Sequence, residues 1–475
     1  MVKSLAHHQQ ISRGPMKSLT RSVCLVAAVL ALSTAGTAQN RQIGINVLLK
    51  SDISTQILAD LSTHGTVLNT LPAIDSLSMK VVESELAAIR ALPYVAAAGP
   101  DAERKGAPVD AVAVSDFAGG INTWDLDAVN VTNFGSTVRG VAYDGRGVYV
   151  AVLDTGLLDS WRQYFPQERI AAQYAKAFNG GGGEKGIVSD PTNKWEHDQN
   201  SHGTHVTSTI LGYKFGTASV NGVAPLATVI PVKVLNQNGS GWSSVVAAGI
   251  TYVADLARGP LAGKPVVINM SLGGPELDPM EKAAVDYAIA SGVIIVAAAG
   301  NEGEAGMGFP GAYAPVISVA ASGWIGEWTP DSAWWRTKDV ADPTRAADFY
   351  ITDFSSREKP GQDLDVAAPG SWTVGPYQTQ SGQTSYFFLG GTSMASPHVA
   401  GIAALMKQKN ASLNQPQIES ILETTAIPLP PGCRNVVDPN IGPTTFCWAI
   451  DAAGAGLATA DAALAGVPAA AARKK

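Results

Sequence analysis

Short apolar runs rich in β-branched residues alternate with helix-like segments through most of this chain, and this alternation limits the folds open to it. The strand-like runs are GVYVAVLD, TVIPVKVL, PVVINMSL, GVIIVAAAG and VISVAAS. The helix-like segments cover residues 202–211, 243–258, 278–290 and 393–409. Near-continuous apolar strands separated by helices are typical of a parallel sheet covered on both faces. We therefore predict an α/β fold with a mostly parallel sheet, whose ligands bind at the carboxyl ends of the strands.

A smaller unit with a different pattern precedes this region. It reads as a strand at 43–49, an amphipathic helix at 52–64, two strands with a turn near Pro72, a second helix that stops before Pro93 and a last strand at 94–98. This β-α-β-β-α-β order is that of a small ferredoxin-like α+β unit. The charged, Pro/Gly-rich stretch at about 99–110 is predicted to be a linker.

The first 38 residues have the pattern of a secretory signal peptide. Lys17 and Arg21 precede the apolar run Val23–Leu32, and small residues follow up to Ala38. A run of this length is too short for a bilayer span but suits an export signal. We predict a signal peptide at 1–38, with Met16 as an alternative start, and a secreted (extracellular or periplasmic) protein. A membrane anchor is the alternative interpretation.

The overall composition is that of a folded protein. Of the 475 residues, 46% are hydrophobic and 15% are charged, which argues against disorder. The formal net charge is −7 and no block of Lys and Arg stands out, which argues against nucleic-acid binding. Of the three cysteines, Cys24 lies in the predicted signal, which leaves Cys433 and Cys447. A disulfide between these two is expected in an exported chain, with two reduced thiols as the alternative.

Two polar residues near the start of the α/β region lie at a strand end and a helix start, where catalytic residues of such folds are expected. Asp154 ends the first strand, although a strand-end Asp often only caps a turn. His202 begins a helix of small residues, and a histidine can serve as a base near neutral pH. An alternative is that Asp198, His202 and His205 are metal ligands. However, the sequence has no further ligand cluster at zinc-site spacing, and no acidic residue stands where the last ligand of a calcium loop is needed.

Two further polar residues lie later in the chain. Asn301 follows the strand GVIIVAAAG, where its amide can donate to an oxyanion or simply form a turn. Ser393 lies in GGTSMASPHVAG, just before a run of small, helix-forming residues. This stretch suits a tight turn that exposes a nucleophile at a helix N-terminus, and the alternative is a Gly-rich loop leading into a buried helix. Ser393 lacks the G-x-S-x-G elbow of α/β-hydrolases.

The segments VLDTG, NSHGTHV, SLGG, AAAGN and GTSMASPHVAG occur in this order, and with them the chain resembles the subtilisin-like serine proteases. The resemblance covers roughly 110–465, and the unit at 39–105 resembles that family's inhibitory propeptide. It implies a catalytic domain at 106–465, and the last residues, 466–475, are predicted from their terminal position to be a flexible tail. The implied roles of the site residues are orienting acid for Asp154, base for His202, nucleophile for Ser393 and oxyanion donor for Asn301.

The resemblance also implies which segments line the substrate cleft. The implied substrate-binding residues are Gly239, Ser240, Gly241, Ser271, Leu272, Gly273, Gly274, Ala298, Ala299 and Gly300. Extended backbone in these segments can pair with a peptide as an added strand. Neither SLGG nor AAAG carries a charge, so we expect the pocket to prefer apolar or aromatic substrate side chains. A preference for basic side chains is not expected, although the nearby Glu302 and Glu304 weaken the argument against it.

The sequence departs from the family pattern in two places. A tryptophan-rich insertion at 323–353 forms either a rim of the cleft or a satellite core. The stretches LLDSWRQYF and KFGTASVNG, where relatives hold a structural calcium, contain Asp159 as their one acidic residue. No cofactor is expected for catalysis. A structural calcium elsewhere in the chain is the alternative left open, and the sequence does not locate its site.

The resemblance implies a secreted serine endopeptidase that acts through an acyl-enzyme and is made as a self-processed zymogen. The alternative is a catalytically silent or only self-processing relative that binds peptides. The expected partners are protein or peptide substrates and the chain's own propeptide. Binding to nucleic acid or membranes is not expected, and the protein is expected to be a monomer.

Overall fold

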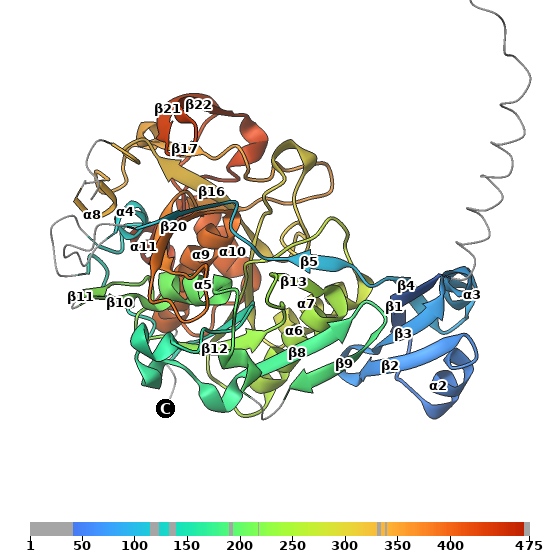
Figure 1. The fold of residues 1–475 in the computed structure, drawn as a ribbon. Helices are drawn as coiled ribbons and strands as arrows, with labels where there is room; N and C mark the ends of the chain where they lie inside the picture. Colours follow the sequence, from blue (N-terminus) through green and yellow to red (C-terminus); the bar gives the residue numbers. More distant parts are fainter. Residues whose placement is uncertain are drawn as a thin grey trace, which may run out of the picture.

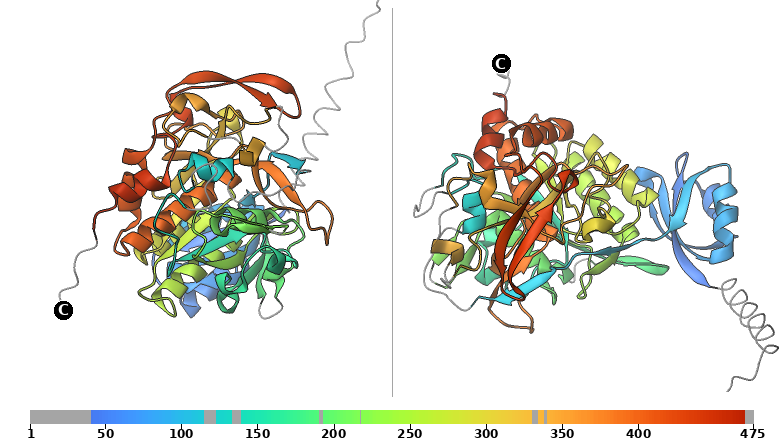
Figure 2. Two further views of the ribbon diagram at one scale, coloured as in Figure 1. Left: turned by 90° about the vertical axis from the view of Figure 1, so that its left-hand side faces the viewer. Right: turned by 90° about the horizontal axis from the view of Figure 1, so that it is seen from above.

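The computed structural model describes residues 41–114, 123–132, 139–189, 193–216, 218–329, 334–337 and 340–469. The predicted signal peptide and residues 470–475 of the predicted tail lie outside them. Figure 1 shows a large lobe and a small N-terminal lobe, with strand β5 (Glu103–Lys105) running from the small lobe over the large one. The view from above in Figure 2 shows the same arrangement.

The large lobe is built on one central sheet. Its order is β17-β16-β15-β14-β7-β12-β8-β9, with β18 also paired to β16. The strands are β7 (Tyr149–Asp154), β8 (Lys176–Gly181), β9 (Glu184–Ser189), β12 (Thr228–Lys233), β14 (Val266–Met270), β15 (Ile294–Ala298), β16 (Ile317–Trp324), β17 (Phe349–Ile351) and β18 (Val366–Pro369). All pairs are parallel except β8 with β9 and β16 with β17. The predicted, mostly parallel sheet is therefore confirmed.

Helices cover both faces of this sheet. They include α5 (His202–Leu211), α6 (Ser243–Arg258), α7 (Pro279–Ala290), α9 (Thr392–Lys409), α10 (Gln415–Thr425) and α11 (Ala460–Gly466). Alternate residues of β7 face opposite sides, because side chains in a strand alternate. Val150 and Val152 join the core formed with α5 and α9, whereas Ala151 and Leu153 join the core formed with α6 and α7. Every residue of β7 after Tyr149 is thus buried, which is why the sequence shows a continuous apolar run.

The small lobe has the predicted α+β order. Its elements are β1 (Gln42–Leu49), α2 (Thr55–Leu61), β2 (Gly65–Leu71), β3 (Ser76–Val82), α3 (Leu86–Ala91) and β4 (Val95–Pro100). The strands pair antiparallel in the order β2-β3-β1-β4 around a separate hydrophobic core. Helix α2 is shorter than the predicted 52–64 at both ends. It begins at Thr55 because the Ser54 side chain caps its N-terminus by accepting from the Ile57 N–H, and it ends at Leu61.

The predicted linker at 99–110 is wrong over most of its length. Strand β5 pairs antiparallel with β13 (Ser240–Trp242), and β6 (Asp110–Ala113) pairs antiparallel with β20 (Tyr386–Gly390). The charged residues suggested a solvated linker, but Arg104 is fully buried against the acidic Glu281, which lies far along the chain. The segment therefore lies extended on the large lobe and does not form a free connection.

The tryptophan-rich insertion forms a satellite core, and part of it belongs to the sheet. Trp324 ends β16, and β17 also falls within 323–353. Trp334 and Trp335 are each 1% exposed and pack on Phe388, with ring centroids 5.6 and 6.2 Å away. Trp328 packs on the same phenylalanine at 4.7 Å. These contacts favour the satellite core over a rim of the cleft.

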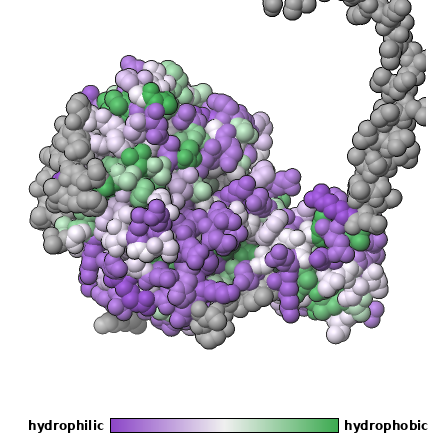
Figure 3. Space-filling view, in the orientation of Figure 1, coloured by the Kyte–Doolittle hydropathy of each residue, from purple (hydrophilic) through white to green (hydrophobic). Residues whose placement is uncertain are grey.

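The two remaining cysteines join one hairpin. Strands β21 (Gly432–Asp438) and β22 (Gly442–Trp448) pair antiparallel, and their register places Cys433 opposite Cys447. The two sulfurs form the predicted disulfide. Among the described helices, none has both the length and the apolar character of a bilayer span. The face drawn in Figure 3 is largely hydrophilic, and its hydrophobic residues form small separate groups.

Candidate active site

Asp154 and His202 meet at the carboxyl end of the central strand β7. Asp154 is the last residue of β7 and His202 is the first residue of α5. The His202 Nδ1 atom lies 2.8 Å from Asp154 Oδ1 and 3.0 Å from Oδ2. Both side chains are fully buried. A carboxylate in this position holds an imidazole in one orientation and stabilises its charged form.

Small residues let α5 approach the carboxylate this closely. A Cβ on Gly203 would lie 2.4 Å from the Gly156 carbonyl oxygen and 3.1 Å from Asp154 Oδ1. The Gly203 N–H donates to the Thr155 hydroxyl oxygen at 2.9 Å. Any larger residue at 203 would push the helix, and with it His202, away from the sheet.

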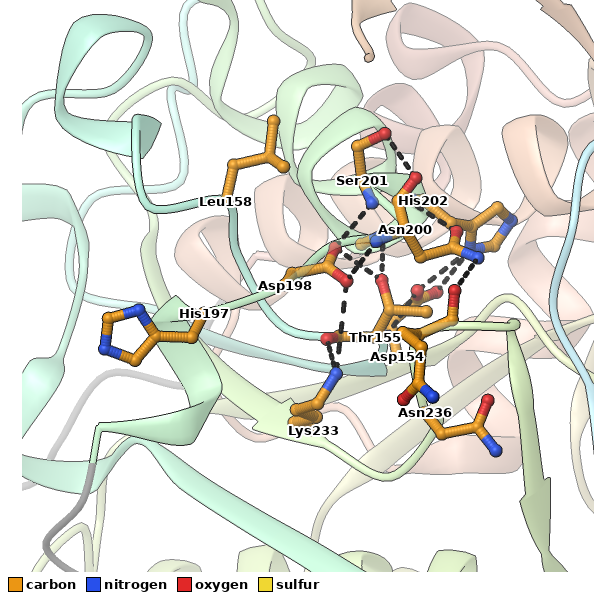
Figure 4. A network of polar contacts seen from close by, with 12 residues as sticks. Asp154, Thr155, Leu158, His197, Asp198, Asn200, Ser201, His202, Lys233 and Asn236 are labelled. Carbon is orange, nitrogen blue, oxygen red and sulfur yellow. Dashed lines mark hydrogen bonds and ion pairs between the residues drawn. The ribbon is translucent and has the colours of Figure 1, made fainter. Parts of the chain in front are cut away.

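A second carboxylate, Asp198, forms hydrogen bonds with the residues next to Asp154 and His202 (Figure 4). Its Oδ2 accepts from the Thr155 hydroxyl and from the Ser201 N–H, each at 2.8 Å. Burial raises the pKa of Asp198, and the Lys233 ammonium 3.9 Å away opposes this rise. Asp198 therefore links the end of β7 to the start of α5.

The metal interpretation of this segment is not supported by its contacts. His202 Nδ1 faces Asp154, whereas His205 Nε2 contacts the Thr373 carbonyl oxygen at 3.2 Å. The two imidazoles thus face different partners, and Asp198 is bound by protein donors. Complete burial lowers the pKa of His205 to about 3, so this histidine is neutral in the ordinary pH range.

Ser393 lies in the first turn of α9. The turn before the helix needs glycine at 391, where φ is +154°. The Ser393 hydroxyl donates to the Ser271 carbonyl at 3.3 Å, and the side chain is 3% exposed. His202 Nε2 is buried and has no hydrogen-bond partner among the described residues. The Ser–His hydrogen bond is therefore not formed here, as is common in sites that tighten only around a reacting substrate.

Asn301 is held so that its amide NH2 group stays available. Its Oδ1 accepts from both the N–H and the hydroxyl of Thr392, each at 2.9 Å. These two donors orient the side chain, and Nδ2 lies beside the Gly391 turn that precedes Ser393. Thr392 is a supporting residue that the sequence analysis did not single out, because a threonine in a Gly-rich stretch carries no signal of its own.

The chain's own segment 103–109 occupies the cleft between these elements. Lys105 and Gly273 exchange two backbone hydrogen bonds of 2.9 Å each. The Gly106 N–H donates to the Gly239 carbonyl at 2.8 Å, and the Val109 N–H donates to the Gly390 carbonyl at 2.7 Å. A Cβ on Gly106 would lie 3.4 Å from His202 Cε1. The extended segment therefore passes directly over the imidazole.

Most of the expected substrate-binding residues line this cleft. A cavity of about 750 Å³ lies beside Asn301 and Ser393. Five of the expected residues line it, namely Leu272, Gly273, Gly274, Ala298 and Gly300. Gly239, Ser240 and Gly241 contact the extended segment, and the Ser271 carbonyl accepts from Ser393. Ala299 is fully buried in the core and is not among the cavity-lining residues.

Two acidic residues near the cavity have partners of their own. Glu302 Oε2 accepts from the Asn301 N–H at 2.7 Å and from the Ser356 hydroxyl at 3.1 Å. Glu304 lies within ion-pair distance of Arg357 and Lys359. The apolar or aromatic preference of the cavity stays an expectation, because charged residues also line it, namely Asp101, Glu103, Lys105, Glu276 and Glu302.

One cluster of carboxylates in the described residues has ligand atoms close enough to share a cation. Asp363, Asp365 and Glu419 bring three such atoms within 4.8 Å of one another. Burial raises the pKa of Asp365 to about 8, and burial with the nearby Glu423 raises that of Glu419 to about 7. The cluster lies outside the stretches around Asp159 and residues 214–222, where relatives hold a structural calcium.

Comparison with known proteins agrees with this geometry. The model of the Subtilase family matches residues 145–459. Subtilisin DY of Bacillus licheniformis is 38% identical over 293 residues, which are 61% of this chain and 87% of that protein. A thermostable alkaline protease of Halalkalibacterium halodurans is 30% identical over 401 residues, which are 84% of this chain and 91% of that protein.

Solved structures show the same fold. Fervidolysin of Fervidobacterium pennivorans superposes with a TM-score of 0.62 at 24% identity, over 90% of this chain but 62% of that one, less than two thirds of its length. Sphericase superposes with a TM-score of 0.51 at 29% identity, over 72% of this chain and 99% of that one. Since the family model covers well over half of the chain, the protein belongs to the subtilase family and is a subtilisin-like serine protease.

Proposed function

We propose that the protein is a secreted serine endopeptidase that uses Asp154, His202 and Ser393 as its catalytic triad and is made as a self-processed zymogen. The observation that carries this proposal is the course of the chain's own segment, which lies extended across His202 and is paired with the cleft on both sides. A peptide substrate would bind in the same way, as an added strand. The disulfide supports an oxidising compartment.

The proposed reaction follows from the positions of these groups. Ser393 attacks the carbonyl carbon while His202 Nε2 takes the hydroxyl proton. His202 then gives that proton to the leaving amine, and a water molecule hydrolyses the acyl-enzyme by the same route. Asp154 stabilises the imidazolium formed in each step. The amide of Asn301 and the N-terminus of α9 stabilise the negative charge that develops on the carbonyl oxygen.

The hydrogen bonds also narrow the proposed processing site. Lys105 and Gly106 are bound on one side of the nucleophile and Val109 on the other, and Ala107 lines the same cavity as Ser393. The cut that releases the N-terminal unit therefore falls between Gly106 and Val109, a few residues beyond the boundary of 105 taken from the sequence. N-terminal sequencing of the purified protein, with a casein assay of its activity, tests both maturation and proteolysis.

Residues 39–107, supplied as a separate peptide, are expected to inhibit the mature enzyme. The small lobe has its own core, and its last residues fill the cleft as a cleaved product would. The measurement is the rate on a chromogenic peptide as the 39–107 peptide is titrated. A Gly106→Val peptide is the matched control, because a Cβ there would lie 2.6 Å from the Ser271 carbonyl oxygen. Unchanged rates in micromolar excess of the unmodified peptide would show that the unit is not an inhibitor.

Asn301→Ala is expected to lower kcat about 10²–10³-fold with little change in KM. An oxyanion donor acts mainly in the transition state, and this magnitude is the one known from subtilisin itself. The variant keeps the backbone, so substrate pairing with Gly239 and Gly273 persists. Asn435→Ala, in the distant strand β21, is the control and should leave both constants unchanged. A raised KM with unchanged kcat would instead assign Asn301 to ground-state binding.

A peptide-binding role without turnover is the second candidate. The observation in its favour is that the Ser393 hydroxyl contacts the Ser271 carbonyl and not His202. Casein hydrolysis by the processed chain decides between the two candidates.

A further inference from the structure

Arg104 is a charged side chain that is completely buried in the cleft. Its guanidinium forms a bidentate pair with Glu281, in which Nε lies 3.0 Å from Oε1 and Nη2 lies 2.6 Å from Oε2. Both side chains are 0% exposed. Nη2 also donates to the Glu276 carbonyl at 2.9 Å. Among the described residues, both oxygens of the Glu281 carboxylate have Arg104 as their hydrogen-bond donor.

The cleft is shaped to admit this side chain. Arg104 lies in β5 opposite Gly241, and its neighbours Glu103 and Lys105 point the other way, as alternation along a strand requires. The side chains of Glu103 and Lys105 are 49% and 69% exposed. A Cβ on Gly274 would lie 2.7 Å from Arg104 Nη1, so glycine at 274 keeps the subsite open.

The position of Arg104 relative to the nucleophile defines this subsite. Ala107 lies at the cavity that contains Ser393, and Gly106 lies over His202. With the bond after Ala107 as the bond to be cut, Arg104 is the fourth residue before it. Glu281, near the start of α7, stays with the large lobe after the N-terminal unit leaves.

We propose that Glu281 is a specificity-determining residue, which makes the enzyme select peptide substrates with arginine at the fourth position before the bond that is cut. The inference rests on the proposed endopeptidase function and names a substrate class for the same cleft. The proposed arginine preference is separate from the apolar or aromatic preference expected beside the nucleophile, where the segments SLGG and AAAG are uncharged. The two preferences concern different side chains of the same peptide.

The preference follows from the cost of burying a charge. A buried carboxylate without a partner loses its hydration, and burial accordingly raises the pKa of Glu281 while Arg104 opposes that rise. Asp278 lies in the same region and adds negative potential. A substrate arginine restores a bidentate, charge-assisted pair. A neutral side chain of the same length would cover Glu281 and leave it unpaired, which is the costly case.

The competing interpretation is that the pair only anchors the N-terminal unit to the large lobe. The two interpretations differ in what the mature enzyme does with short peptides that contain no N-terminal lobe. The test uses the peptide Ala-Glu-Arg-Lys-Gly-Ala, which corresponds to residues 102–107, with a p-nitroanilide at its C-terminus. Matched peptides carry citrulline, a neutral isostere of arginine, or leucine in place of the arginine.

The mature wild-type enzyme is expected to cut the arginine peptide with a kcat/KM at least about 30-fold above that of the citrulline peptide, since leaving one partner of a buried charge pair unpaired typically costs this much or more. Glu281→Gln should reduce the ratio to below about threefold, by the same argument. Asp286→Asn is the matched control on the same helix α7, because its carboxylate is exposed and paired with Lys282, and it should keep the ratio. Replacing the exposed lysine of the peptide by norleucine should change kcat/KM by less than about threefold.

The outcomes separate this inference from the proposed function. Equal kcat/KM for the arginine and citrulline peptides on the wild-type enzyme would overturn the inference and leave the endopeptidase function standing. That comparison needs no variant, so it holds even where Glu281→Gln fails to mature. If the anilides are cut too slowly to measure, the same peptides are compared as competitive inhibitors of casein hydrolysis, with the same ratio expected. If the processed enzyme hydrolyses neither the anilides nor casein, the proposed endopeptidase function itself is overturned.

Discussion

Ser393→Ala is expected to abolish proteolysis and to leave the N-terminal unit attached. The proposed nucleophile is the only hydroxyl in the first turn of α9 that both lines the cavity and contacts the Ser271 carbonyl. Without it neither the acyl-enzyme nor self-processing can occur. Loss of the corresponding serine in subtilisin lowers kcat about 10⁶-fold, and we expect a loss of the same order. The measurement is casein hydrolysis together with the mass of the purified chain.

The control for this variant is Ser412→Ala, an exposed serine beyond the end of α9. It should mature and hydrolyse casein like the wild type. Ser393→Ala should unfold at a similar temperature to the Asp154→Asn precursor, which is expected to stay unprocessed as well, since the Ser393 hydroxyl makes one long hydrogen bond. Normal maturation of Ser393→Ala in a protease-free host would contradict self-processing by this serine.

Asp154→Asn is expected to lower kcat about 10⁴-fold and to leave KM nearly unchanged. The amide keeps the shape of the carboxylate but places an NH2 group where His202 Nδ1 now faces two acceptor oxygens, at 2.8 and 3.0 Å. A donor there favours the imidazole tautomer with its proton on Nε2, which cannot take the Ser393 proton. The amide also lacks the charge that stabilises the imidazolium. The magnitude is the one measured for this replacement in the Ser-His-Asp template.

The matched control is Asp159→Asn, which removes an exposed carboxylate beside His197. It should change kcat by less than about threefold, because exposed ion pairs contribute little. Chemical denaturation of both variants, in the Ser393→Ala background to prevent autolysis, checks that neither effect is an unfolding effect. A kcat for Asp154→Asn within tenfold of the wild type would exclude Asp154 as the orienting acid.

Local patterns in the sequence were enough for the architecture. The inner strands β7, β14, β15 and β16 bury nearly all of their residues, so the apolar run that a parallel sheet requires is visible in the chain itself, as in Tyr149–Asp154. The α+β order of the small lobe was predictable from a different signal. Its strands and helices are short and are separated by turn residues that mark their ends. Helix α2 shows the limit of this approach, because its start depends on one side-chain cap at Ser54.

The sequence also singled out Asp154 and His202, which meet at the end of β7, and Asn301 and Ser393, which line one cavity. Asp154, His202, Asn301 and Ser393 stand at strand ends or helix starts, and in an α/β fold these positions converge on one edge of the sheet. The expectation that Asp154 and His202 are in contact came from the resemblance to the subtilisin-like serine proteases. The supporting residues Thr155 and Thr392 were not singled out, because threonines are frequent in turns and only their hydrogen-bond partners distinguish them.

The sequence by itself thus determined the layers of the fold, the family and the group of polar residues at the sheet edge, because periodicity and short motifs are local properties of the chain. The tertiary structure alone decided what fills the cleft and what the cleft contacts. Arg104 and Glu281 are 177 residues apart, and each looks like an ordinary solvated charge in the sequence. Whether such a charge is exposed or buried against an opposite charge depends on which distant segments pack together. For the same reason the predicted linker contains strand β5, and Gly106, just after that strand, lies over His202.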